Sequence, residues 1–282
     1  MTGEAPHIVT DSTSDLPPEL ARRLDITVIP CQIHFGSETY HEGVDIARHE
    51  LHRRLRNGER ATTSQPAVGV FAETYRRLLQ DGQPIVSIHL ASRLSGVYST
   101  ACLAAREVDP ERISVVDTQQ VTMCSGWVAV HAAEAAREGR SCADILRLIE
   151  DMLPRLCLYA LIDDLHFLQR SGRVTWARSL LGNLLAIKPI AIVRQGEVSL
   201  AEKVRSFARG LDRIIALATG AGRLEHVAIL HAGAPQAAAY LEERLQEQVP
   251  REQMVLGEAG VVITAHAGPG AAGLACLYAG DH

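Results

Sequence analysis

The chain has 282 residues, of which 47% are hydrophobic and 22% charged, with a formal net charge of -5 and a pI near 6.2. These values are typical of a globular protein, and the length favours two domains. They argue against a broad nucleic-acid interface, which would need a basic face. No stretch is long and apolar enough to span a bilayer, and the first residues show no signal-peptide pattern. We therefore expect a cytoplasmic, soluble protein without stable membrane insertion.

Neither cysteines nor histidines form a pattern that indicates a metal site. The six cysteines include no CxxC pair, which excludes a zinc knuckle or a redox motif of that type. His49 and His52 are one helical turn apart and could chelate a metal with His41 or Glu42. No nearby segment completes a tetrahedral set, so we predict no metal site and no cofactor.

In the first half of the chain, short apolar runs alternate with helix-compatible segments. Strands are predicted at His7–Thr10, Ile26–Phe35, Pro84–Leu90 and Ile113–Val116. Helices are predicted at Arg48–Arg56, Ala67–Gln80 and Val97–Val108, with others beginning after Leu16 and after Thr118. This alternation predicts a parallel sheet with helices on both faces.

From Leu156 the pattern changes, because a hairpin stands among the helices. Strands are predicted at Leu156–Leu161, Ile187–Val193, Glu197–Leu200, His226–His231 and Gly260–Ala265, and helices at Val204–Gly220 and Gln236–Gln248. A hairpin among helices favours a mixed sheet. The predicted fold is therefore α/β, with a mostly parallel domain at residues 1–155, a mixed-sheet domain at 156–282, and a ligand site between or within them.

Hydroxyl-rich turns follow several predicted strands of the first half. They are Ser12–Ser14, Thr62–Ser64, Ser92 with Ser95, and Thr118. Each could simply cap a helix, since Ser and Thr are preferred there. In an open α/β sheet, however, ligands bind outside the carboxyl ends of the strands, where these turns should converge. Ser95-Gly96 stands out because glycine lets backbone N–H groups approach an anion.

Near the end of the chain, Gly268, Gly270 and Gly273 match GxGxxG after a predicted strand. No completing strand and no acidic residue about 20 positions later can follow, so a dinucleotide site is poorly supported. A glycine-rich turn would still bring backbone donors and His266 close to an anion. The sequence contains no P-loop, and without a GxSxG elbow Ser95 has little support as a hydrolase nucleophile.

Taken together and in order, several segments resemble the DegV family of bacterial fatty-acid-binding proteins. The matching segments are Asp11–Pro17, Thr63–Pro66, Leu94–Tyr98, Val116–Thr118, Leu168–Arg173, Ile187–Pro189, Lys203–Arg205 and His266–Gly270. The resemblance covers essentially the whole chain. Ala67, Val97 and Ser171 depart from the family pattern, and Ser171 lies in the loop that aims Arg173.

The resemblance implies a carrier that buries the tail of a long-chain fatty acid, such as palmitate or oleate, and keeps its carboxylate near the surface. Thr63 and Ser95 would bind the carboxylate, with His266 in the same network. Arg173 would contact an acyl phosphate and Arg205 would belong to a docking surface. In this family the carrier has no independent activity; it presents the fatty acid to a separate ATP-dependent fatty acid kinase subunit, which forms acyl phosphate for phospholipid synthesis.

Two other functions remain open from the residues alone. The chain could be a stand-alone phosphotransferase or hydrolase that uses an anion site at Ser95 and His266. It could instead be a nucleotide-binding regulator built on Gly268–Gly273. Turnover by the purified chain would favour the first, and saturable nucleotide binding the second.

Overall fold

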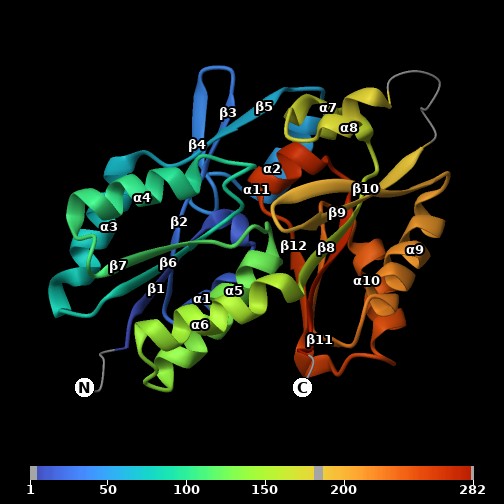
Figure 1. The fold of residues 1–282 in the computed structure, drawn as a ribbon. Coiled ribbons are helices and arrows are strands. Elements are labelled where there is room, and N and C mark those ends of the chain that lie inside the picture. The colour runs from blue at the N-terminus through green and yellow to red at the C-terminus, as the bar shows by residue number, and fades with distance from the viewer. Residues whose placement is uncertain (1–4, 181–186, 281–282) are drawn as a thin grey trace.

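A four-stranded parallel sheet organises the first half of the computed structural model, which describes residues 5–180 and 187–280 (Figure 1). Its strands are β1 (His7–Asp11), β2 (Ile26–Ile29), β6 (Ile85–His89) and β7 (Ile113–Asp117), in the order β2-β1-β6-β7. All three pairings are parallel, as predicted. The carboxyl ends of β1, β6 and β7 therefore meet at one edge of the sheet.

Helices cover both faces of the parallel sheet. They are α1 (Pro18–Arg23), α3 (Val68–Leu78), α4 (Val97–Val108), α5 (Met123–Arg137) and α6 (Cys142–Met152), whereas α2 (Arg48–Arg56) packs against α11 (Val261–Ala267) of the second half. Figure 1 shows α3 and α4 on one face and α5 and α6 on the other. Short 3-10 turns follow β1 (Ser12–Ser14) and α3 (Leu79–Asp81).

Helix α5 is buried on nearly all sides, because it packs against the parallel sheet and also against β8 and β13 of the second sheet. Its sequence is accordingly apolar around the whole helix rather than along one stripe. Trp127 donates its indole N–H to the carbonyl of Ala275 in β13 at 3.1 Å. This helix therefore forms much of the contact between the two halves.

A six-stranded mixed sheet organises the second half. Its strands are β8 (Leu156–Leu161), β9 (Lys188–Arg194), β10 (Glu197–Val204), β11 (Leu224–His231), β12 (Met254–Glu258) and β13 (Ala272–Tyr278), in the order β10-β9-β8-β13-β11-β12. Only β11 and β12 pair in parallel among these described strands. The predicted hairpin between β9 and β10 is confirmed, with a turn at Gln195-Gly196.

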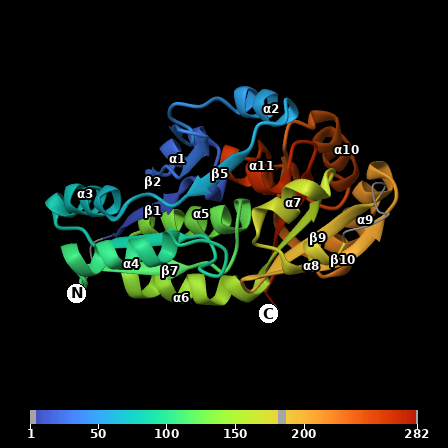
Figure 2. The ribbon, with the colours of Figure 1, turned by 90° about the horizontal axis from the view of Figure 1, so that it is seen from above.

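The remaining helices of the second half lie on the two sides of this sheet. They are α7 (Leu165–Ser171), α8 (Thr175–Ser179), α9 (Phe207–Gly220), α10 (Pro235–Leu245) and α11 (Val261–Ala267), with 3-10 turns at Leu153–Arg155 and Arg251–Gln253. Helices α9 and α10 pack on the outer face, whereas α7 and α11 lie at the junction with the first half (Figure 2). None of the helices in the described ranges is both long and apolar enough to cross a membrane.

The prediction of one strand over Ile26–Phe35 was wrong. The chain forms two strands there, and the second, β3 (Gln32–Phe35), pairs with β4 (Glu38–His41) and β5 (Ala61–Ser64) in a separate antiparallel sheet. Pro30 separates the two strands and has no N–H to donate to a ladder. Thr62–Ser64 therefore belong to a strand of this small sheet, not to a turn at the edge of the parallel sheet.

The prediction of a strand at Gly260–Ala265 was also wrong, because this segment is the helix α11. β-branched residues favour a strand by local propensity, but tertiary partners override that preference here. Carboxylates from the first half accept the N–H groups of Gly260 and Val262 at the start of the helix. The strands β12 and β13, on either side of it, were not predicted.

Other elements are close to their predicted bounds. Helix α4 and strand β8 coincide with prediction, whereas the helix predicted from Val204 begins at Phe207, capped by Ser206, whose hydroxyl accepts the Arg209 N–H at 3.3 Å. The hydrophobic core runs across the predicted domain boundary, and Leu156 and Leu158 belong to the cluster that fills the first half. The boundary near residue 155 stays a prediction.

Candidate functional site

Two of the residues expected at an anion site meet directly across the junction between the halves. Thr63, on β5, and His266, near the end of α11, lie with Oγ1 and Nε2 2.8 Å apart. The residues are 203 positions apart in the chain. Their contact depends on α11 packing against β5 at the junction.

Ser95 and Gly96 lie in the turn that leads into α4, and both line the same cavity as Thr63 and His266. Among the described residues, the Ser95 hydroxyl has one hydrogen bond, a long one of 3.4 Å that it accepts from the N–H of Val97, so it retains capacity to donate. A Cβ at position 96 would lie 3.1 Å from the side-chain nitrogen of Gln65. Glycine therefore lets the segments around Ser95 and Gln65 approach closely.

The cavity runs inward from these polar residues and is lined mainly by apolar side chains from both halves. Its apolar lining includes Leu90, Leu94, Val121, Leu158, Ile162, Leu168, Val174, Val193, Val198, Leu230, Val262 and Ile263. The space free of protein atoms is about 1280 Å³, including the part open to solvent.

A second, outer hollow adjoins the polar end of the cavity. The two share Thr63, Ser171, Arg173 and His266. The outer hollow also contains Arg60 and Arg170, which sequence reasoning did not identify because arginine is common throughout this chain. The Thr63–His266 pair thus lies between an apolar interior and an arginine-rich exterior.

Arg173 is exposed and follows Gly172, which ends α7 in the left-handed conformation with φ of 70°. Ser171 shapes this loop, since its hydroxyl donates to the carbonyl of Leu168 at 2.7 Å and accepts the Arg173 N–H at 3.2 Å. The guanidinium of Arg173 in turn donates to the carbonyl of Ser171 at 2.6 Å. The residue that departs from the family pattern therefore takes part in orienting the arginine.

His266 is held in its neutral form. Burial, and then the nearby charge of Arg173, lowers its pKa to about 4. A neutral imidazole carries one ring proton, so the direction of the hydrogen bond with Thr63 depends on the tautomer. When His266 donates from Nε2, the Thr63 hydroxyl proton is free for a ligand oxygen.

Two buried carboxylates from the first half hold the start of α11. Asp15 Oδ1 accepts the N–H of Gly260 at 2.9 Å, and Glu42 Oε1 accepts that of Val262 at 2.9 Å. Burial is the main cause that raises the pKa of both groups, and the charge of Glu42 raises that of Asp15 further. Sequence reasoning included Asp15 in a motif but did not predict this role, and it considered Glu42 only as a metal ligand.

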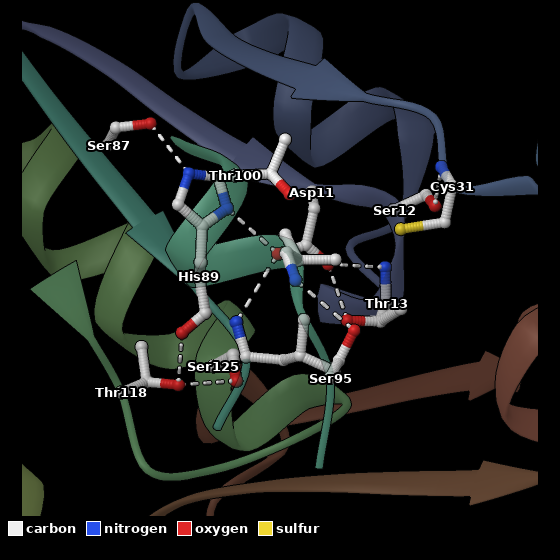
Figure 3. Close-up of polar contacts among 12 residues, drawn as sticks. Asp11, Ser12, Thr13, Cys31, Ser87, His89, Ser95, Thr100, Thr118 and Ser125 are labelled. Carbon is white, nitrogen blue, oxygen red and sulfur yellow. Dashed lines mark hydrogen bonds and ion pairs between the residues drawn. The ribbon is translucent and has the colours of Figure 1, made fainter. Parts of the chain in front are cut away.

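A second polar network joins Asp11, Ser87 and His89 in the first half (Figure 3). His89 Nδ1 lies 2.9 Å from Asp11 Oδ2, and His89 Nε2 lies 2.7 Å from the hydroxyl of Ser87. Ser87, His89 and Asp11 are at most 1% exposed, and the Ser87 hydroxyl is also bonded to Tyr75 at 2.7 Å. A substrate cannot reach this serine, so the arrangement does not favour a hydrolase.

The remaining hydroxyl turns have partners within the fold. The Thr118 hydroxyl donates to the carbonyl of His89 at 2.8 Å, and that of Ser12 donates to Glu42 at 2.5 Å. Thr13 donates to Asp11, although it also lines the cavity. Of the four turns that were expected to converge, Ser95 and Thr13 line the cavity, and Thr63 lines it from the strand β5.

Packing accounts for the glycine-rich turn without a nucleotide. Gly268 and Gly270 have φ of 86° and 92°, and a Cβ on Gly268 would lie 2.7 Å from the ring of Phe167. Gly273 lies in β13, where a Cβ would meet the carbonyl oxygen of Tyr159 at 2.7 Å. The turn follows a short helix, not the strand that a dinucleotide fingerprint requires.

Arg205 lies apart from the other predicted site residues. It is exposed, between the end of β10 and the start of α9, and it lines neither the cavity nor the outer hollow as far as the described residues define them. The structure thus brings Thr63, Ser95, Arg173 and His266 to one cavity and leaves Arg205 on the surface.

Comparisons with known proteins agree with this fold. A family model described as "Uncharacterised protein, DegV family" matches residues 6–279. A DegV domain-containing protein of Streptomyces coelicolor is 37% identical over 271 residues, with 95% of this chain and 96% of that protein covered. One from Deinococcus radiodurans is 36% identical over 275 residues, with 95% and 96% covered.

Solved structures show the same architecture. A Thermus thermophilus DegV family protein described by its fatty acid binding is 33% identical, with a TM-score of 0.90 and coverage of 98% of this chain and 100% of that one. DegV of Bacillus subtilis, described as a fatty acid binding protein, is 31% identical, with a TM-score of 0.85 and coverage of 98% and 100%. With its family model and its relatives matched over nearly the whole length, this chain belongs to the DegV family.

Proposed function

We propose that this protein binds a long-chain fatty acid, such as palmitate or oleate, with its tail in the apolar cavity and its carboxylate beside Thr63, Ser95 and His266. The observation that carries the proposal is the change of lining along one cavity, from apolar side chains inside to the Thr63–His266 pair at its outer end. An amphiphile with one anionic end fits such a gradient. The relatives from Thermus and Bacillus, described as fatty-acid binding, support the same ligand class.

The tail sets the affinity in this arrangement. Burying the fifteen tail carbons of palmitate at about 0.8 kcal/mol each contributes about 12 kcal/mol before the costs of association. A hydrogen bond to the charged carboxylate adds only about 1.5–3 kcal/mol. The hydroxyls of Thr63 and Ser95 therefore chiefly fix the position of the carboxylate.

We further propose that the protein acts as a carrier subunit, which presents the carboxylate to a separate ATP-dependent fatty acid kinase for acyl-phosphate formation. The outer hollow supports this role, because it gives access to the carboxylate end and carries Arg60, Arg170 and Arg173. The acidic residue among its described lining, Glu59, is already paired with Arg54 at 2.8 Å. Guanidinium groups can bind a phosphoryl group in a bidentate manner.

Arg205 is proposed as part of the surface that docks the kinase. It is exposed and separate from the cavity, so it can contact a partner without touching the cargo. Arginine is frequently among the residues that dominate the energy of an interface.

Mass spectrometry of small molecules released by denaturing the freshly purified protein tests the lipid assignment. We expect about one C14–C20 fatty acid per chain, since so much buried tail dissociates slowly. Recovery of no fatty acid, together with no uptake of added palmitate or oleate, would contradict the proposal. Turnover of an acyl phosphate or an ester by the chain alone would instead favour an enzyme that acts at Ser95 and His266.

A further inference from the structure

Three potential metal ligands lie together where α5 meets the start of β11. They are His131, on α5, and the consecutive residues Glu225 and His226, on β11. One ligand atom from each residue lies within 4.8 Å of the other two. None of the three residues lines the lipid cavity, so this cluster is separate from the proposed lipid site.

A β-bulge explains how two neighbours on one strand can face the same place. Consecutive strand residues normally point to opposite faces of a sheet. The register between β11 and β13 shifts between Leu224 and His226, so that Glu225 is the extra residue. Bulges redirect individual side chains, and this one allows Glu225 and His226 to approach the same histidine of α5.

The two histidines each carry a buried nitrogen that the fold leaves unused. His131 Nε2 and His226 Nδ1 have no hydrogen-bond partner among residues 5–180 and 187–280. Buried polar atoms in native proteins are nearly always bonded to protein, water or an ion. The two rings lie 5.0 Å apart, and Trp127 packs against that of His226 at 4.9 Å.

The surroundings suit metal ligation. Burial lowers the pKa of both His131 and His226, which favours the neutral imidazole that binds a metal. The Arg155 guanidinium donates a hydrogen bond to Glu225 Oε2 at 2.8 Å, while Glu225 Oε1 has no hydrogen bond with the described residues. Glu134 Oε2 lies 3.5 Å from His131 Nδ1. A carboxylate beside the ring nitrogen that does not bind the metal commonly orients a ligating histidine.

We propose that His131, His226 and Glu225 form a binding site for a divalent transition-metal ion of the Zn²⁺ type, which links α5 to β11 across the two halves. Two imidazoles and one carboxylate are a ligand set typical of zinc, whereas Mg²⁺ and Ca²⁺ prefer oxygen ligands alone. Ligand atoms of a tetrahedral zinc site lie about 3.3 Å apart, and those of this cluster lie within 4.8 Å of one another, so the side chains need to close by at most about 1.5 Å on binding. The sequence contains no sign of this site, because its ligands come from two distant elements.

Zinc titration of the tag-free protein, treated with a chelator and dialysed, tests the site. Competition with a chromogenic chelator should show one tightly bound Zn²⁺ per chain. His131→Gln and His226→Gln should weaken it about 10-fold or more, and Glu225→Gln should weaken it in the same direction. His166→Gln is the matched control, since His166 is exposed and bonded to Asp164 at 2.8 Å, and it should bind zinc as the parent does.

Thermal unfolding gives a second readout. A ligand that binds only the folded state raises the unfolding temperature, so Zn²⁺ should stabilise the parent and the control but not His131→Gln. Absence of stoichiometric binding to the parent, or unchanged affinity in the variants of His131 and Glu225, would overturn the proposal. If a histidine variant fails to fold, Glu225→Gln carries the test, because the Glu225 side chain is 35% exposed. Fatty acid content should be the same in all variants, which separates this proposal from the lipid assignment.

Discussion

Replacing Thr63 by valine isolates the contribution of one hydroxyl to the head-group site. Valine keeps the β-branched shape that suits β5 and removes only the hydrogen-bonding oxygen, which lies 2.8 Å from His266 Nε2. Loss of this bond should lower the free energy of unfolding by about 1 kcal/mol. Loss of a donor to a bound carboxylate should weaken palmitate binding by about 1–3 kcal/mol, which is about 5- to 150-fold in Kd.

Thr62→Val provides the matched control for this variant. Thr62 is the preceding residue of the same strand, it is exposed, and its side chain points to the opposite face. Both variants should be stripped of lipid and titrated with palmitate in a fluorescence displacement assay. If Thr63→Val and Thr62→Val bind palmitate equally well, Thr63 does not contact the carboxylate and the orientation of the ligand must be reconsidered.

Three further predictions address the surroundings of the site. Arg173→Ala should keep its fatty acid and its affinity for the kinase but lose acyl-phosphate formation. Arg205→Ala should keep its fatty acid and lose about 2 kcal/mol of kinase affinity. Fatty acid content, kinase affinity and acyl-phosphate yield should be measured for both variants, and loss of fatty acid from Arg205→Ala with unchanged kinase affinity would contradict the docking role. The pKa of His266 is about 4 in the folded protein, below its ordinary value of 6.5, so the unfolded chain binds a proton first as the pH falls, and stability should decrease between pH 7 and pH 4. The unfolding temperature of His266→Gln should fall less between pH 7 and pH 5 than that of the parent. An equal fall would show that another group causes the pH dependence. Calorimetry should detect neither NAD(H) nor ATP binding at the turn of Gly268–Gly273, and micromolar affinity for either would contradict the packing explanation of these glycines.

The sequence predicted the regular parts of the fold because their signals are local. The bounds of α4 and β8 follow from hydrophobic periodicity and from the glycine and turn residues around them. The errors arose where distant residues decide the structure. Residues 261–264 have β-branched side chains, yet their backbone is helical, and the carboxylates of Asp15 and Glu42 cap its first turn.

The candidate site was predictable only in part for the same reason. Thr63, Ser95, Arg173 and His266 were singled out through motifs, and the structure brings all four to one cavity. The resemblance implied that His266 shares a network with Thr63, but not their direct bond, which joins two elements across the junction of the halves. Nor could they reveal the outer hollow, because Arg60 and Arg170 stand in no motif and resemble the many other arginines of the chain.

Helix α11 makes the head-group site depend on both halves of the molecule. A seven-residue helix is too short to be stable alone, so contacts at its two ends must determine where it lies. Its first turn is bonded to Asp15 and Glu42 of the first half, and Gly268 at its other end packs closely on Phe167 of the second. Keeping two carboxylates buried costs free energy, which their raised pKa values reflect. In return, the hydrogen bonds of these carboxylates fix the position of α11, and with it His266 opposite Thr63. A ligand that contacts both residues should therefore also strengthen the contact between the two halves.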